Sequence, residues 1–262
     1  MVYTYCNVSS FYVLPDAALR VGFSLIISVQ SREESCIMNL TPFSWFLVAF
    51  SGFCWTVVYL DSIRLGFKQA TYAMPFWALV LNIAWELQQA VLEYQAAGFV
   101  LQVGISAVWF LLDGVILYTY FRFGKKYFPD NLRKHWFLVW SILALLTAFI
   151  LQYAFLIEFG LYVGRQYSAF LQNLLMSVLF IGMLVNRGSS EGQSLTIAVS
   201  KWLGTLAPTI LFGVLGGEHM SGPNVLIFVA GVFCSLFDLI YIWMLLRIKG
   251  AEKRGETIGV LF

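Results

Sequence analysis

Two carboxylates lie inside long apolar stretches of this chain. Glu86 lies in the stretch from Ala73 to Val91, and Asp238 interrupts a second stretch near the C-terminus. An ionisable side chain at bilayer depth is costly, and it is a candidate functional residue by default. Two such acids in a mostly apolar chain suggest acid chemistry on an apolar substrate.

The composition indicates a membrane protein that crosses the bilayer several times. The chain is 60% hydrophobic and 11% charged, whereas soluble domains carry roughly 25% charged residues. A span needs about 20 apolar residues, and continuous runs favour helices because lipid cannot satisfy free backbone groups. The predicted fold is all-α, a bundle of seven transmembrane helices near residues 43–60, 73–95, 99–121, 136–157, 168–186, 195–215 and 225–247.

The basic residues predict the orientation of this bundle. Lys and Arg gather in alternate loops and in the C-terminal tail, while the opposite loops hold only Arg165. Because cytoplasmic loops carry the excess of Lys and Arg, we expect the first span to begin on the luminal side and the C-terminus to be cytoplasmic. The net charge of +2 is too small to argue for a nucleic-acid partner.

The chain divides into three predicted parts. Residues 1–40 form an N-terminal extension that could be an extra membrane span, an interfacial helix or a signal-like segment. Residues 41–250 form the seven-span domain, and residues 251–262 form a short cytoplasmic tail.

The second predicted span carries a polar stripe. Asn82, Glu86, Gln89 and Glu93 are spaced by four, three and four residues, so they share one helix face. Such a face turns toward the bundle interior or a cavity. Asn and Gln commonly bridge helices, so a structural role stays open for Asn82 and Gln89, whereas a carboxylic acid is a poor choice for bridging alone. Glu93 lies near the luminal end, where we expect it to be solvated.

The last predicted span places Asp238 near small residues. Gly231 and Ser235 share its face and allow a helix or ligand to approach closely, and Tyr241 follows three residues later. The alternative for Asp238 is an ion pair with Lys201 of the sixth span.

The third predicted span adds Asp113, with Trp109 on the same face. Its alternative role is a pairing with Arg122 or with a backbone group. Aromatic residues form 18% of the chain, and several, including Trp85, lie deep in spans. These rings either pack helices or line a cavity in which π faces stabilise a carbocation.

The sequence lacks the residues that several other functions of membrane proteins require. The last span holds no lysine before Lys249 that could bind retinal, and no Gly-rich phosphate loop or Asp-rich diphosphate motif is present. The two histidines lie in separate loops, so we expect no metal site and no cofactor. Once these functions are excluded, the two buried acids favour chemistry that begins with transfer of a proton.

The residues around Glu86 also carry a family resemblance. The blocks that carry it are Ile63-Arg-Leu-Gly-Phe-Lys68, Thr71-Tyr-Ala-Met-Pro75, Ala78-Leu79, Asn82-Ile-Ala-Trp-Glu86, Trp109-Phe-Leu-Leu-Asp113, Gln172-Asn173 with Ser177, Gly204-Thr205 with Pro208-Thr209, and Leu236-Phe-Asp238 with Tyr241. Through these blocks the chain resembles, over residues 43–247, the fungal integral-membrane terpene cyclases of meroterpenoid and indole-diterpene pathways.

The resemblance implies an enzyme of the endoplasmic reticulum membrane. Its members cyclise a linear prenyl chain that a partner flavin epoxidase has usually epoxidised, downstream of a prenyltransferase. Two acids are held responsible in that family, and the matching positions here are Glu86 and Asp238. Asn82, Trp85, Asp113, Trp109 and Tyr241 are then candidates for shaping the substrate site.

Burial keeps a carboxyl group protonated near neutral pH, as protonation of an epoxide requires. If Glu86 and Asp238 face one cavity, they could share a proton, one as general acid and the other as its partner. The competing hypothesis is a small seven-span transporter or receptor-like protein, in which the two acids relay protons or bind a ligand cation.

Overall fold

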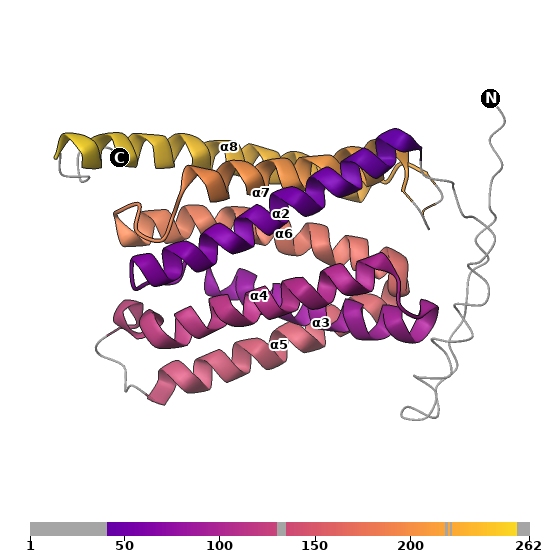
Figure 1. Cartoon of the computed structure of the whole chain (residues 1–262), viewed down its shortest axis with the longest axis horizontal. Helices are drawn as coiled ribbons and strands as arrows, with labels where there is room; N and C mark the ends of the chain where they lie inside the picture. The colour runs from indigo at the N-terminus through magenta and orange to yellow at the C-terminus, as the bar shows by residue number, and fades with distance from the viewer. Residues whose placement is uncertain (1–40, 130–134, 218–219, 221, 256–262) are drawn as a thin grey trace.

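The structure is a computed structural model that describes residues 41–129, 135–217, 220 and 222–255 (Figure 1). The predicted extension 1–40 and the end of the tail lie outside the described residues. Every regular element in the described part of the chain is helical, so the all-α prediction is confirmed. The elements are α2 (Pro42–Lys68), α3 (Phe76–Ala97), α4 (Leu101–Phe123), η1 (Gly124–Tyr127), α5 (His135–Phe159), α6 (Leu161–Arg187), α7 (Leu195–Pro208), η2 (Thr209–Leu215) and α8 (Val225–Arg254).

Six helices in the described residues are long and apolar enough to cross a membrane: α2, α4 with η1, α5, α6, α7 with η2, and α8. The predicted span near 73–95 is a helix, α3, but it falls short in apolar character. The physical reason is its position, since α3 packs against α4, α5 and α6. A helix surrounded by protein can carry polar side chains that lipid would not accept.

The polar stripe of α3 lies on its buried face, as its spacing predicted. Asn82, Glu86, Gln89 and Glu93 are all buried. Pro75 precedes the helix and Gly98 ends it with a φ of 75°, a conformation that glycine adopts without steric cost. The helix is thus fixed at both ends with its polar face inward.

Two predicted boundaries were wrong. The fifth span was expected to begin at residue 168, but α6 begins at Leu161 and contains Arg165. Arg165 forms an ion pair with Glu93. This pairing offsets the cost of burying the Arg165 charge, so residues 161–167 are helical and not part of a loop. The last helix, α8, continues to Arg254 and carries basic residues in its final turn, where the helix dipole favours cations.

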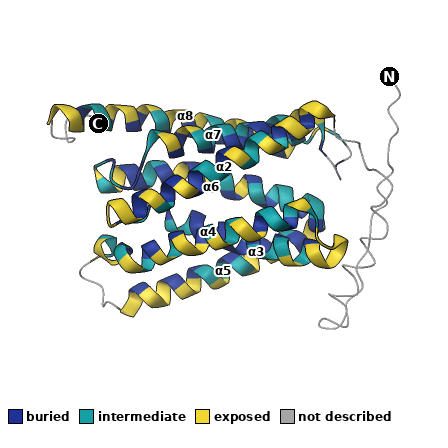
Figure 2. Cartoon of the chain, viewed as in Figure 1, coloured by how far each residue is buried: buried dark blue, intermediate teal, exposed yellow. Residues whose placement is uncertain are grey.

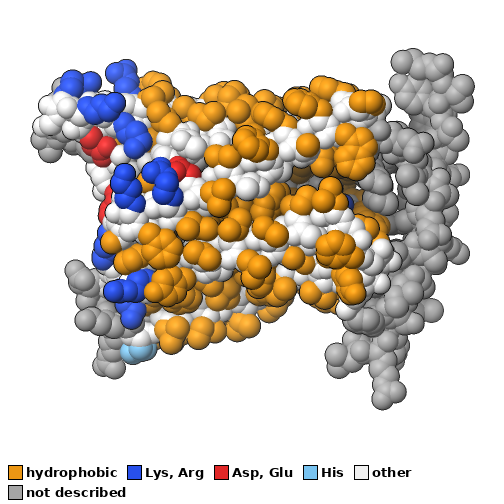
Figure 3. All heavy atoms as spheres, in the orientation of Figure 1, with side chains coloured by type: hydrophobic (Ala, Val, Ile, Leu, Met, Phe, Trp, Pro, Cys, Tyr) orange, Lys and Arg blue, Asp and Glu red, His pale blue; other side chains and the backbone are white. Residues whose placement is uncertain are grey.

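The outer surface of the bundle is apolar. Figure 2 shows exposed residues along the outward faces of the helices and buried residues between them. The exposed set includes large side chains such as Phe53, Leu111 and Ile150, each more than two-thirds exposed. Lys and Arg side chains gather at one end of the molecule, which we call the basic end (Figure 3). An apolar belt with charges collected at an end fits an integral membrane protein.

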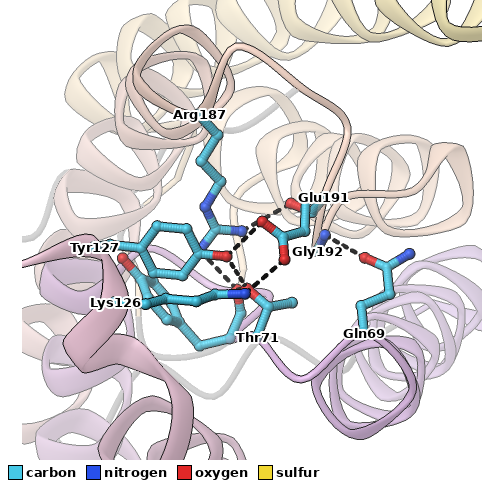
Figure 4. Close-up of polar contacts among 8 residues, drawn as sticks. Gln69, Thr71, Lys126, Tyr127, Arg187, Glu191 and Gly192 are labelled. Carbon is cyan, nitrogen blue, oxygen red and sulfur yellow. Dashed lines mark hydrogen bonds and ion pairs between the residues drawn. The ribbon is translucent and has the colours of Figure 1, made fainter.

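A polar cluster ties the helix ends together at the basic end (Figure 4). The Arg187 guanidinium lies over the rings of Tyr72 and Tyr127, at 4.5 and 4.3 Å from their centroids. It also donates to the backbone oxygens of Tyr72 at 3.0 Å and Glu191 at 2.8 Å. The Glu191 carboxylate accepts from Lys126 and from the Tyr127 hydroxyl, each at 2.7 Å.

This basic-end cluster explains part of the sequence block that carries the family resemblance. Gln69 accepts the backbone N–H of Gly192, which has a φ of 70°, and Thr71 hydrogen-bonds to Tyr127 at 2.6 Å. The turn after α2 is therefore joined to η1 and to the α6–α7 loop. These residues hold the scaffold, while the residues that follow in α3 enter the interior.

Candidate active site

A cavity of about 600 Å³ lies between α2, α3, α4, α6 and η2. Small-molecule sites typically measure roughly 300–1,000 Å³, so this one is large enough for a compact organic ligand. Aromatic side chains dominate its inner wall: Trp55, Tyr59, Trp85 and Trp109. Glu86 is the carboxyl group among these rings.

Glu86 is 3% exposed. The Tyr59 hydroxyl donates to its Oε1 at 3.5 Å, the Ser106 hydroxyl lies close, and Oε2 has no hydrogen-bond partner in the described residues. No ion pair to Glu86 occurs in that part of the chain. Burying an isolated charge is costly, so a carboxyl group in this position is a candidate functional residue.

A chain of hydrogen bonds between four helices leads to the Tyr59 hydroxyl, which contacts Glu86. Gln152 donates to Gln172 at 2.6 Å, Gln172 donates to Asn82 at 3.1 Å, and Asn82 donates to Tyr59 at 3.2 Å. The Tyr59 hydroxyl then faces Glu86. Asn82 thus bridges three helices and also lines the cavity, which combines the two roles left open by the sequence.

Asp113 lies near Glu86 on the neighbouring helix α4. Its side chain is fully buried, and neither carboxyl oxygen has a hydrogen-bond partner in the described residues. The two carboxyl groups are close enough for their charges to interact. Asp113 does not line the cavity, but Trp109 does, and its indole N–H donates to the Thr56 hydroxyl at 3.2 Å. Within the described part of the chain, Asp113 does not pair with Arg122 or with a backbone group.

The structure does not bring Asp238 to this cavity. The Lys201 ammonium donates to Asp238 Oδ1 at 2.7 Å and to the Ser177 hydroxyl at 2.7 Å, and both charged side chains are fully buried. The expectation that Glu86 and Asp238 face one cavity is therefore not met, and the alternative pairing with Lys201 is what the structure contains. Tyr241 is also outside the cavity, where its hydroxyl donates to Gln193 at 3.0 Å.

The sequence reasoning missed two features of the cavity. Glu93 was expected to be solvated, but it is 6% exposed and bonds Arg165 at 3.0 Å. The isolated position of Arg165 among loops otherwise free of basic residues was the available signal. Tyr59 carried no signal, because a tyrosine in an apolar helix is as often a packing residue.

A local change of helix type shapes one wall. The chain passes from α-helix to π-helix after Pro208, and Leu211 and Phe212 of η2 line the cavity. Short π-helical segments are frequent at functional sites. Gly231 of α8 lies against Thr209, so a Cβ at this position would clash with the threonine side chain.

Comparisons with known proteins identify the family of this chain. A profile of the Pyr4-like transmembrane terpene cyclases matches residues 30–251. The chain is 32% identical over 174 residues to the Pyr4-family terpene cyclase mfmH of Annulohypoxylon moriforme, covering 63% of this chain and 68% of the relative. It is 26% identical over 237 residues to the terpene cyclase pyr4 of Aspergillus fumigatus, covering 87% of this chain and 93% of the relative.

A third relative is the terpene cyclase adrI of Penicillium rubens, 30% identical over 206 residues, covering 76% of this chain and 81% of the relative. No solved structure matches this chain. The family profile covers most of the chain, including all the helices that line the cavity. The chain belongs to the family of Pyr4-like transmembrane terpene cyclases.

Proposed function

We propose that this protein cyclises a linear prenyl chain by protonating its terminal epoxide, or its terminal alkene, with the Glu86 carboxylic acid. The observation that carries the proposal is a buried carboxyl group, without an ion-pair partner in the described residues, on the wall of an aromatic cavity. The relatives named as terpene cyclases support it.

The proposed reaction begins with transfer of the Glu86 proton to the epoxide oxygen. The adjacent C–O bond breaks, the oxygen becomes a hydroxyl group, and an alkene of the chain forms a C–C bond to the electron-poor carbon. Each ring closure passes the positive charge along the chain. Loss of a proton to a base, or capture by water or a substrate group, ends the cascade, and Glu86 regains its proton.

The cavity wall contributes stabilisation of the cation. Trp55, Trp85 and Trp109 present π systems to the interior, and a cation over an aromatic face gains about 2 kcal/mol or more when it is desolvated. An apolar wall also excludes water that would trap the first cation. The Tyr59 hydroxyl donates to the Glu86 carboxyl, and Asn82 donates to that hydroxyl from the other side.

For Asp238 we propose a positioning role through Lys201. The Ser177 hydroxyl accepts from Lys201 and donates to the Asn173 carbonyl oxygen at 2.9 Å, and Asn173 lines the cavity. The ion pair thus lies behind one wall of the site. Direct proton donation by Asp238 is the competing proposal, and the two differ in what happens when both charges are removed.

We further propose the cellular setting. The protein lies in the endoplasmic reticulum membrane and crosses it seven times, because α3 adds one span to the other six. Its basic end is in the cytoplasm, and the start of α2 is on the luminal side. Its substrate is a prenylated molecule that a prenyltransferase and a flavin epoxidase supply. The gathering of Lys and Arg at one end supports the orientation.

The test is product formation in microsomes that contain this chain and a terminally epoxidised prenyl substrate. Glu86→Gln keeps the size and removes the acid, so we expect turnover to fall by about 10²- to 10⁴-fold, the usual contribution of a general acid. Glu191→Gln, at the basic end, is the matched control and should retain activity. Full activity of Glu86→Gln would refute the assignment.

A further inference from the structure

The cavity that holds Glu86 continues to the end of the bundle opposite the basic end. Its lining follows α3 from Glu86 through Glu93 to Ala97 and includes Leu101 at the start of α4. Glu93 is seven residues beyond Glu86, which places it about 10 Å further along the helix axis at 1.5 Å per residue. We call this outer part of the cavity the mouth.

The mouth combines polar and apolar side chains, and the inner wall is richer in aromatic rings. Glu93, Gln102, Arg165 and Gln166 line the mouth together with Ala97 and Leu101. A few convergent polar groups in a largely apolar cavity are what fix the orientation of a bound ligand. The two charged side chains of the mouth, Glu93 and Arg165, give it hydrogen-bonding groups suited to a ligand group with oxygen or nitrogen atoms.

An ion pair forms the centre of the mouth. Arg165 Nη1 donates to Glu93 Oε2 at 3.0 Å, with side chains 14% and 8% exposed. The guanidinium lies over the Tyr162 ring at 5.5 Å, and Tyr162 also lines the cavity. A guanidinium has five N–H donors in a planar fork, of which the bond to Glu93 uses one.

The mouth is connected to the catalytic region through the backbone. The Trp85 indole N–H donates to the Arg165 carbonyl oxygen at 3.1 Å, and Trp85 precedes Glu86 in α3. The backbone of Arg165 is therefore tied to the helix that carries the acid. A purely structural role, in which the ion pair joins α3 to α6, is the alternative. That role would not require both partners to line the cavity.

We propose that the mouth binds the polar, non-terpenoid head group of the substrate, with Arg165 and Glu93 as its specificity-determining residues. The prenyl chain then enters first, and its far end reaches Glu86. Arg165 would donate to an oxygen of the head group, and Glu93 would accept from an adjacent O–H or N–H. A planar ring with a carbonyl or carboxylate next to a hydroxyl group matches both contacts and can lie beside Tyr162. This proposal rests on the proposed cyclase function.

The experiment compares two matched probes, a terminally epoxidised prenylated 2-hydroxybenzoate and the terminally epoxidised prenyl alcohol, each at farnesyl and geranylgeranyl length. The variant Arg165→Gln/Glu93→Gln removes both charges together, so that neither remains buried alone. We expect its KM for the head-group probe to rise by about 10- to 100-fold, as loss of hydrogen bonds to charged groups predicts, with kcat nearly unchanged. The KM for the alcohol should stay within about twofold.

The controls separate binding from folding. Lys126→Gln/Glu191→Gln removes a more exposed ion pair at the basic end, far from the cavity lining, and should change neither KM. Arg165→Lys keeps the charge without the planar fork and should lie between wild type and the double variant. The melting temperature of each purified variant shows whether it is folded.

Each outcome decides one proposal. Equal losses of the double variant on both probes, or no loss on either, would mean that the ion pair only joins α3 to α6, and the head-group proposal would be wrong. Equal KM values of the wild type for both probes would overturn it as well, with the cyclase function intact. Failure of the wild type to convert any of the four probes would instead contradict the proposed function.

Discussion

Removing the carboxylate of Asp238 while keeping Lys201 leaves a buried ammonium group without its anion. Both side chains are fully buried, and their charged atoms are 2.7 Å apart. Breaking a buried pair on one side costs about 3–5 kcal/mol. At about 2–4 °C per kcal/mol for a chain of this size, Asp238→Asn should lower the melting temperature by roughly 6–20 °C. We expect an inactive protein for this reason alone.

The informative variant removes both charges. Replacing a buried pair by apolar residues of similar volume is often neutral or stabilising by about 1–4 kcal/mol, so Lys201→Met/Asp238→Leu should melt near the wild-type temperature. A positioning role predicts that its cyclisation rate in microsomes returns to within about 10-fold of wild type. Direct proton donation predicts a folded double variant that stays at least about 10²-fold slower.

The assay is a thermal melt of each purified variant in detergent, paired with product formation from the epoxidised probe. The single variant Lys201→Met completes the cycle and should be as destabilised as Asp238→Asn. A double variant that is folded but inactive would refute the positioning role of Asp238. Additive losses of stability in the double variant would refute the energetic argument, because they would show no coupling between the two charges.

Two further predictions concern the Glu86 contact and the basic-end cluster. Tyr59→Phe removes the hydroxyl that faces Glu86, and it should reduce kcat by about 2- to 10-fold, the value of one hydrogen bond; an unchanged kcat would show that Tyr59 only packs. Partial burial raises the pKa of Glu191, but hydrogen bonds from Lys126 and Tyr127 outweigh it and leave that pKa below its usual value. A lowered folded-state pKa stabilises the fold above the unfolded pKa of about 4.3, and this stabilisation is lost as the pH falls through the folded pKa. The melting temperature of wild type should therefore exceed that of Glu191→Gln at pH 7, and the two should converge in acid.

The helices could be predicted from the sequence because their physical cause is local. Continuous apolar runs and the spacing of the α3 stripe fix which segments are helical and which face is buried. Ends were less predictable, because they depend on partners that lie far away in the chain. The charge of Arg165 predicted a loop residue, but the structure places it in α6, where it pairs with Glu93, 72 positions earlier in the chain.

The site was predictable in part for the same reason. Helical spacing marked Glu86 and Asn82, the aromatic residues deep in spans included Trp85 and Trp109, and all four side chains line the cavity. Tyr241 and Asp238 had equally suitable types and spacing, yet α8 turns them toward Gln193 and Lys201. Residue type gives the chemistry that is available, and the packing of helices decides which groups share a cavity.

The two acids that marked this chain differ in their partners more than in their burial. Asp238 has the Lys201 ammonium at 2.7 Å, and it does not line the cavity. Glu86 has hydroxyl groups of Tyr59 and Ser106 nearby and another acid, Asp113, within electrostatic range. Glu86 lines the cavity and has no ion-pair partner in the described residues, so its carboxyl group is the one that a bound substrate can reach. The same cost of burying a charge thus makes one acid a candidate donor and the other part of the scaffold.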